Sequence, residues 1–339
     1  MSMGPVEALD RVVYLLDRAL AESQKVRAFA RARDVAEEVG VAELTERHAH
    51  GKLTELSGIG PSTAKVIGEA LDGEESGYVA KLEEETVIPL DEGRAIRAAL
   101  KGDCHTHSTW SDGGASIEKM ARTAESLGHE YLVMTDHSPR LTVAHGLTKE
   151  RLRQQLDEIR ELNETLSPFR ILTGIEVDIL PDGTLDQDEK LLAELDVVVA
   201  SVHSKLRMPR EEMTRRMVLA LANPHVDILG HVTGRKVVGT GRPQSEFDPE
   251  IVFAACARFD VALEINCRPE RQDPPDDLLA MAIEWGLHFS IDTDAHAPGQ
   301  MEWQSYGCDK AARHGIPADR IVNTQPAMDL VAWAGSNPV

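Results

Sequence analysis

The sequence predicts an α/β protein in which a barrel of repeated strand–helix units follows a short all-helical domain. Two observations carry this prediction. From Gly102 onwards, short apolar runs alternate with segments of helical periodicity, as in a parallel sheet covered by helices. Histidines and carboxylates follow the apolar runs at their C-terminal ends, which is where a parallel barrel gathers side chains at one point.

Three segments are predicted along the chain. Residues 1–85 form the helical domain, because apolar residues recur there at helical spacing and Gly40 ends one such run. Residues 86–100 are a linker, and residues 101–339 form the barrel. After a first strand near Gly102, the predicted strands are 131–135, 170–175, 197–201, 226–230, 261–265 and 288–291. The predicted helices between them are 117–127, 149–166, 211–221, 249–258 and 276–285.

Composition limits the classes of protein to which the chain can belong. Of the 339 residues 42% are hydrophobic, enough for a sizeable core, but no apolar stretch is long enough to span a bilayer. Residues 1–10 lack the basic, apolar and small-residue series of a signal peptide, so we predict a cytoplasmic protein without a membrane partner. The cysteines are far apart and form no CxxC, which argues against a zinc ribbon or a disulfide framework.

The charge of the chain restricts how it can contact nucleic acid. The formal net charge is -21, and residues 1–90 also carry more acidic than basic side chains. Because phosphate contacts require Lys and Arg, a nonspecific nucleic-acid coat is excluded and any such contact must be local. Bound divalent ions would supply the missing positive charge within one pocket.

An ordered series of histidines and carboxylates indicates a metal site. The pair His105 and His107 shares one face of a strand, so both imidazoles can hold one ion. The full series consists of residues at or just beyond predicted strand ends: His105, His107, Asp112, His137, Glu176, His203, His231, Asp294 and His296.

The motifs around these residues resemble those of the polymerase and histidinol phosphatase (PHP) superfamily over about residues 101–330. They are Gly-Asp-Cys-His-Thr-His, Thr-Asp-His-Ser, Gly-Ile-Glu-Val-Asp, Ser-Val-His-Ser, Gly-His-Val-Thr-Gly-Arg and Asp-Ala-His. The resemblance implies a distorted (β/α)7 barrel and a phosphoesterase that uses a metal-activated hydroxide. It implies three divalent ions, Zn or Mn with Fe also possible, because mixed His and carboxylate donors suit each of them.

The same resemblance assigns the ligands to the ions. The first ion would be held by His105, His107, Glu176 and Asp294. The second would be held by His203 and His231, with Glu176 as a bridge, and the third by Asp112, His137 and His296.

Polar residues beside the ligands have two interpretations. The segment Glu264–Arg271 resembles one in the PHP domain of bacterial family X DNA polymerases, so Arg268 and Arg235 are predicted to take part in catalysis by holding phosphate. Glu176 is predicted to take part in catalysis as the carboxylate that bridges two ions. The alternative for the arginines is surface salt bridging. Asp103 and Asp136 are predicted either to orient imidazoles or to cap turns.

A second motif, Leu56–Ala64, resembles a helix-hairpin-helix. Its two glycines allow a tight turn, and the N–H groups that begin the next helix can bind a DNA phosphate. Residues 6–75 resemble the N-terminal domain of family X DNA polymerases, which recognises DNA ends and gaps. The residues predicted to contact DNA are Gly58, Ile59, Gly60, Ser62, Lys25, Arg27 and Arg31.

The hairpin also has an alternative interpretation, as a dimerisation or docking module. The lyase lysine of the eukaryotic domain falls at Val66, which makes Schiff-base chemistry doubtful and leaves any role of Lys65 open. Too few residues separate the hairpin from the metal motifs to hold a polymerase palm, so polymerase activity is not expected.

Three functions are therefore compared. The first is a phosphoesterase that acts on DNA ends as a 3′–5′ exonuclease, a 3′-phosphatase or an abasic-site enzyme. The second is a small-molecule phosphomonoesterase, such as a histidinol-phosphate or nucleotide phosphatase, and the acidic composition favours it slightly. The third is a binding module with a relic metal site, which the intact ligand series disfavours. The sequence leaves the oligomeric state, the metal and the polarity of digestion open.

Overall fold

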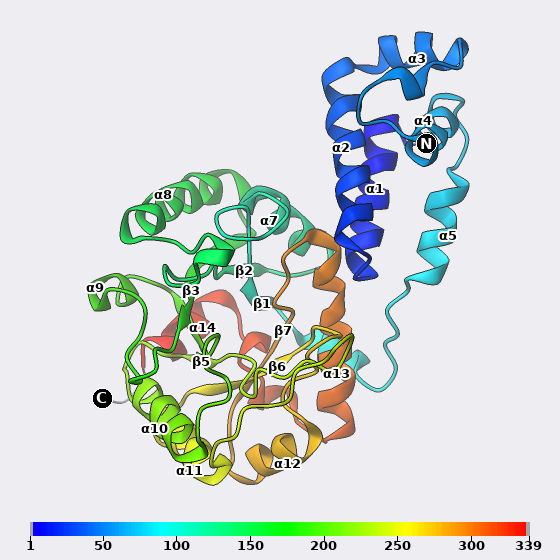
Figure 1. The fold of residues 1–339 in the computed structure, drawn as a ribbon. Coiled ribbons are helices and arrows are strands. Elements are labelled where there is room, and N and C mark those ends of the chain that lie inside the picture. The colour runs from blue at the N-terminus through cyan, green and yellow to red at the C-terminus, as the bar shows by residue number, and fades with distance from the viewer. Residues whose placement is uncertain (1–2, 337–339) are drawn as a thin grey trace. The chain divides into compact units, whose positions relative to one another are not determined.

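The computed structural model describes residues 3–336, and the chain divides into two compact units. The first contains the chain up to Ile88 together with Pro298–Gln300, and the second contains 89–297 and the chain from Met301 onwards. Each unit can be followed by its colour in Figure 1. No helix within the described residues is long and apolar enough to cross a membrane.

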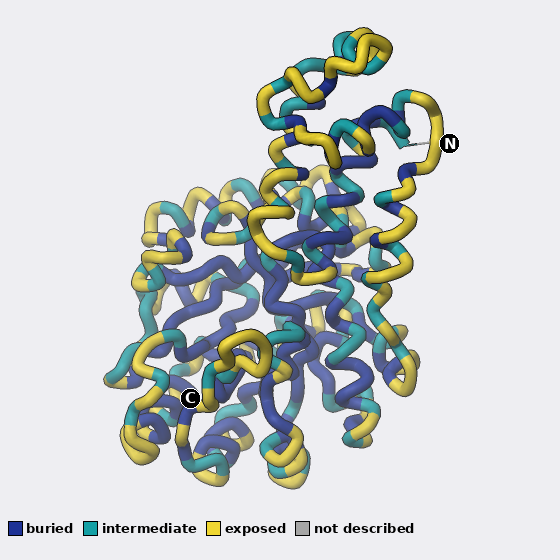
Figure 2. The backbone as a smooth tube through the Cα atoms, turned by 45° about the vertical axis from the view of Figure 1, so that its right-hand side comes forward, coloured by how far each residue is buried: buried dark blue, intermediate teal, exposed yellow. Residues whose placement is uncertain are grey.

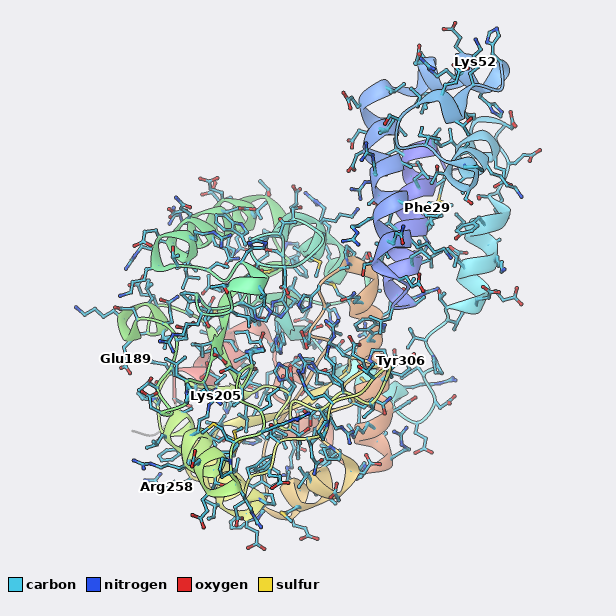
Figure 3. All side chains as sticks on the ribbon, viewed as in Figure 1. Phe29, Lys52, Glu189, Lys205, Arg258 and Tyr306 are labelled. Atoms are coloured by element: carbon cyan, nitrogen blue, oxygen red, sulfur yellow. The ribbon has the colours of Figure 1, made fainter. Side chains whose placement is uncertain are left out.

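The first unit is all-helical. Its elements are α1 (Pro5–Arg18), α2 (Ser23–Val39), α3 (Val41–Ala49), the 3-10 turn η1 (Leu53–Glu55), α4 (Pro61–Leu71) and α5 (Gly77–Glu85). The apolar face of α1, with Leu9 and Val12, is buried against α2 and α4, which contribute Phe29 and Ile67. Phe29, labelled in Figure 3, stacks on Tyr78 with ring centroids 5.2 Å apart.

The turn before α4 depends on one glycine. Gly58 has φ +103°, and a Cβ there would lie 2.9 Å from Arg31 Nε and 3.2 Å from Val35 Cγ2. Ile59 beside it is buried. Gly60 instead has φ -96°, which any residue adopts, and its N–H donates to Thr63 Oγ1 at 2.9 Å. Of the two glycines thought to allow the turn, the backbone therefore requires only Gly58.

The second unit is the predicted barrel, and its fold class is confirmed. Within residues 3–336 the strands form one parallel sheet in sequential order, β1-β2-β3-β4-β5-β6-β7. Their bounds are β1 (Gly102–Thr106), β2 (Tyr131–Met134), β3 (Arg170–Asp178), β4 (Val197–Ser201), β5 (Ile228–Leu229), β6 (Ala262–Asn266) and β7 (Phe289–Asp292). Figure 2 shows these strands as the buried centre of the unit, as expected for a parallel sheet covered by helices.

Helices surround the strands (Figure 1). They are α6 (Arg94–Ala99), α7 (Ile117–Ser126), α8 (Lys149–Leu166), α9 (Glu189–Leu192), α10 (Arg210–Leu221), α11 (Pro249–Phe259), α12 (Asp276–Glu284), α13 (Gln304–Arg313) and α14 (Ala327–Ala334). The 3-10 turns are η2 (Thr142–Ala144), η3 (Pro298–Trp303), η4 (Ala318–Arg320) and η5 (Val322–Thr324). Helix α6 lies inside the segment predicted as a linker, and β5 is shorter than its predicted run of five residues.

Side chains join the first and last strands. At the carboxyl end, Thr106 and Ala295 form a single parallel bridge. Below it, Gln304 Nε2 donates to Gly102 O and Ile291 O, both at 3.0 Å. Asn323 Nδ2 donates to the same two carbonyls at 3.1 and 2.8 Å. These amides satisfy backbone groups that a continuous ladder would otherwise pair, so the barrel is closed by side chains from its C-terminal segment.

Replacing Asn323 by Leu should destabilise the barrel. The amide is fully buried, and its Oδ1 also accepts the Ile291 N–H at 3.1 Å. Leu has a similar size but leaves these backbone groups with fewer partners, so we expect a loss of about 2–4 kcal/mol in the free energy of unfolding. Urea denaturation followed by tryptophan fluorescence measures this loss, and a change below about 0.5 kcal/mol would contradict the role given to the amide.

The glycines of the hairpin provide a matched pair. Gly58→Ala should destabilise the first unit by about 1–3 kcal/mol, because of its positive φ and the close approach of Arg31. Gly60→Ala should change stability by less than about 0.5 kcal/mol. Hydrogen exchange of the α2 and α4 amides in the full chain measures both. Equal effects of the two substitutions would show that Gly58 is not needed for the turn.

Candidate metal centre

The predicted ligands converge at the carboxyl end of the barrel. Glu176 lies within β3 and His105 within β1, while His137, His203 and His231 follow β2, β4 and β5. His107 and Asp112 lie beyond β1, and Asp294 and His296 lie beyond β7. Parallel strands end at the same edge, so residues far apart in the sequence reach a common point.

Glu176 lies at the centre of this group. Its Oε2 is 2.7 Å from His137 Nδ1, 3.4 Å from His105 Nε2 and 3.6 Å from His107 Nε2. Its Oε1 is 2.8 Å from His231 Nε2 and 3.1 Å from His203 Nε2. One buried carboxylate therefore contacts imidazoles delivered by several different strands.

Among residues 3–336, three groups of donors lie close enough to share an ion, with one ligand atom of each residue within 4.8 Å of those of the others. They are His107, Asp112, His137 and His296; His105, His107 and Asp294; and His137, Glu176 and His203. His107 and His137 each belong to two groups, and His231 joins the assembly through Glu176. The three groups therefore share most of their residues with the ligand sets implied by the resemblance. They differ in that His107 also joins Asp112, His137 and His296, and that His137 also joins Glu176 and His203.

Unpaired buried atoms show that this donor set fits a cation. His105 Nε2, both ring nitrogens of His107 and of His203, and Glu176 Oε2 are buried and make no hydrogen bond. Buried polar atoms normally have partners, and a cluster of orphaned nitrogen and oxygen donors is what a bound metal ion would satisfy. Mixed imidazole and carboxylate donors suit divalent transition metals.

The protonation states of His107 and Glu176 also suit a metal. Burial, together with the neighbouring His296 and His137, lowers the pKa of His107 well below its ordinary value. Burial alone would raise the pKa of Glu176, but His203, His105 and His137 hold it well below its usual range. A neutral imidazole and an ionised carboxylate are the forms that bind metal, because each offers a lone pair.

Two carboxylates for which no supporting role was predicted orient these imidazoles. Glu264 Oε1 lies 2.5 Å from His105 Nδ1, and its Oε2 accepts the backbone N–H of His231 at 2.5 Å. Asp178 Oδ1 accepts the backbone N–H of His203 at 3.0 Å. Asp178 follows Glu176 by two residues on β3, so it shares the ligand face, and this spacing was the available signal.

Asp103 and Asp136 make the backbone and hydroxyl contacts of the second of their two predicted roles, that of capping turns. Asp136 Oδ1 accepts the backbone N–H groups of Ser108 and Ser111, at 2.9 and 3.1 Å, which fixes the loop that carries Asp112. Asp103 Oδ2 accepts from Thr293 Oγ1 at 2.5 Å. Both carboxylates therefore fix the backbone around the ligands.

The two arginines predicted to be catalytic are already engaged. The Arg235 guanidinium donates to the carbonyls of Arg271, at 3.1 Å from Nε, and of Gln272. Arg235 therefore braces a loop. Arg268 Nη1 donates to Asp294 O at 2.6 Å, and its Nη2 is 3.0 Å from Glu270 Oε1. Arg268 thus supports the backbone of a ligand.

The residues predicted to contact DNA lie in the first unit. Lys25, Arg27 and Arg31 on α2 are exposed, and so is Ser62 at the start of α4. Lys65 is exposed as well, and its Nζ is 3.7 Å from Glu69 Oε1.

Comparison with known proteins identifies the family. Residues 103–268 match the PHP domain. A probable phosphatase of Thermoanaerobacter sp. (strain X514) is 30% identical over 234 residues, which cover 66% of this chain and 89% of that protein. The chain belongs to the PHP domain family. With the donor set described above, it is a metal-dependent phosphoesterase.

Two further similarities extend the comparison. The DNA polymerase/3′-5′ exonuclease PolX of Bacillus subtilis (strain 168) is 42% identical over 238 residues, 70% of this chain. That alignment spans only 41% of PolX. A solved structure of histidinol phosphate phosphatase from Lactococcus lactis, complexed with Zn, L-histidinol and phosphate, is 21% identical. It covers 64% of this chain and 95% of its own, with a TM-score of 0.45.

Replacing Glu264 by Gln should weaken metal binding. The amide would present an N–H either to His105 or to the His231 backbone N–H, where the carboxylate now accepts from both. We expect an affinity for Zn²⁺ or Mn²⁺ that is about 10- to 100-fold lower, because such supports fix ligand orientation. Competition with a chromophoric chelator measures it, with the exposed Glu284→Gln on α12 as control. Equal affinities of the two variants would exclude an orienting role for Glu264.

Proposed function

We propose that this chain hydrolyses phosphate esters at DNA ends, as a 3′–5′ exonuclease, a 3′-phosphatase or an abasic-site enzyme, with three divalent ions of Zn or Mn, or of Fe. The observation that carries the proposal is the donor cluster around Glu176. The 42% identity to PolX, whose name includes a 3′-5′ exonuclease, supports DNA as the substrate.

Some residues of the site would bind the ions, and others keep the metal-binding side chains in position. His105, His107, Glu176 and Asp294 would bind one ion, with Glu176 shared with a second ion. When bound, such ions supply Lewis-acid charge to phosphate oxygens and acidify water. Glu264 keeps His105 in position, and Arg268 holds the carbonyl of Asp294.

The first unit is the proposed DNA-binding element. Helix α4 begins at Pro61, and its N-cap, Gly60, lacks a side chain that could cover the first N–H groups. Those groups, together with the exposed Ser62, form a site at which a phosphate can bind. Lys25, Arg27 and Arg31 would add positive charge on α2, and this local charge is needed in a chain whose net charge is -21.

A small-molecule phosphomonoesterase is the second candidate. It is favoured by the match to a probable phosphatase, which covers 89% of that protein, and by the acidic composition, because a polyanion is repelled more strongly than a small ester. In that case the first unit would serve as a docking module.

His107→Ala should abolish hydrolysis on every substrate. His107 belongs to two of the donor groups, so its loss removes ligands from both. We expect at least about a 100-fold loss of kcat/KM. The assay uses a 5′-labelled duplex with a recessed or nicked 3′ end, and the same preparation is tested on histidinol phosphate. His288→Ala is the matched control, because that histidine is half-buried, lies outside the three donor groups and is paired with Asp260 at 2.9 Å.

The outcomes separate the two candidates. Stepwise shortening of the duplex that disappears only in His107→Ala supports action on DNA ends. Release of phosphate from histidinol phosphate without shortening favours the small-molecule enzyme. Wild-type rates in His107→Ala would contradict the metal-site assignment itself.

A further inference from the structure

An arginine beside the metal centre has a buried nitrogen atom without a hydrogen-bond partner. Arg271 lies in the loop after β6, its side chain is 14% exposed, and its Nη1 makes no hydrogen bond. Nε is 3.2 Å from Asp294 Oδ2, and Asp294 is a predicted ligand. A buried guanidinium with unused N–H groups is costly unless an anion satisfies them. An anion bound by Arg271 would therefore lie next to the metal centre.

Its neighbour Arg268 differs in this respect. Arg268 donates to Asp294 O and Glu270 Oε1 and lies over the Trp303 ring, with the guanidinium carbon 5.4 Å from the ring centroid. Asp294 is thus shared between the two arginines, while Glu270 Oε1 is taken by Arg268. Of the two guanidinium groups, that of Arg271 has the greater unused capacity for a substrate oxygen.

A basic hairpin, residues 236–242, brings two more cations to the same place. Lys236 and Arg242 face each other across an antiparallel bridge, with backbone N–O distances of 2.9 and 2.8 Å. The Val237 N–H donates to Glu270 O at 2.7 Å, which ties the hairpin to the loop that carries Arg271. Burial lowers the pKa of Lys236 and that of Arg242, and the charge of Arg271 lowers both further.

The arrangement suits a ligand with more than one phosphate. A monoester carries a single phosphate, for which Arg271 beside Asp294 is a sufficient partner. Lys236 and Arg242 extend the positive charge along the hairpin, where Lys236 is exposed. At the tip, Val237 and Val238 are 47% and 55% exposed, an apolar surface against which a nucleobase can lie. Sites that bind single-stranded nucleic acid combine a positively charged surface for the backbone with side chains against which the bases lie.

We propose that Arg271, Lys236 and Arg242 form a subsite for the phosphate that adjoins the scissile one, so that the substrate is a phosphodiester-linked strand. This inference rests on the proposed function and specifies its substrate class. The subsite belongs entirely to the second unit, so the strand can be held there whatever the first unit binds.

The test compares two ligands that differ in the number of linked nucleotides, and so in the number of phosphates. The metal-free full chain is titrated with thymidine trinucleotide carrying a 5′-phosphate and with thymidine 5′-monophosphate, by calorimetry at several salt concentrations. The variants are Lys236→Gln/Arg242→Gln, which removes the charges, and Lys236→Arg/Arg242→Lys, which keeps them. Arg258→Gln is the surface control, on α11 and labelled in Figure 3.

We expect the neutral double variant to bind the trinucleotide about 10-fold more weakly while its affinity for the monophosphate changes less than about 2-fold. The slope of log affinity against log salt should fall by about 0.7 for each phosphate that the variant no longer neutralises. The charge-preserving variant and Arg258→Gln should both behave as the wild type does.

Three results would overturn the subsite. They are wild-type affinities that are equal for the two ligands, equal losses for both ligands in the neutral variant, and an equal loss in the charge-preserving variant. Failure of the proposed function looks different. In that case the trinucleotide binds as expected, but the metal-loaded chain does not shorten it.

Discussion

The position of one buried carboxylate, Glu176, constrains the rest of the barrel. An ionised carboxylate in a protein interior costs several kcal/mol unless compensating charges and hydrogen bonds surround it. Here the compensation comes from imidazoles at the ends of different strands, within 2.7–3.6 Å of its oxygens. The same imidazoles have unpaired ring nitrogens, so the arrangement that offsets the charge of Glu176 also leaves a set of metal donors. The same imidazoles therefore both stabilise the buried charge of Glu176 and offer donor atoms to a metal.

Two predicted ligands that lie beyond the strand ends, Asp294 and His231, are positioned by a strained backbone and by hydrogen bonds. Asp294 has φ 52° and His231 has φ 20°, conformations that cost about 1–3 kcal/mol each for residues other than glycine. The strained residues are held by neighbours, since Arg268 binds the Asp294 carbonyl and Glu264 binds the His231 N–H. Polar contacts thus help to fix the loops beyond β5 and β7.

The sequence was informative wherever the signal is local. Strand ends and ligand positions such as His203 and His231 followed from apolar runs that stop before a donor. Contacts between segments far apart in the sequence could not be predicted from any local pattern. Asn323 and Gln304 look like ordinary polar residues until the structure shows that they reach Gly102. The direction in which an arginine side chain points could not be predicted from the sequence either. Arg235 and Arg271 both follow strands, but only the folded loop shows that the first is bound to backbone carbonyls. Gly60, in a glycine motif, has an ordinary φ.

The closure of the barrel by side chains has a consequence for the order in which the protein can form. Gln304 and Asn323 are separated from Gly102 by 202 and 221 residues. During synthesis, the ribosome must release most of the barrel before either amide can reach the first strand. Contacts of such long range form late and slowly. A nascent chain would therefore carry its first histidines long before it holds them in place, and hydrolytic activity would arise only near the end of folding.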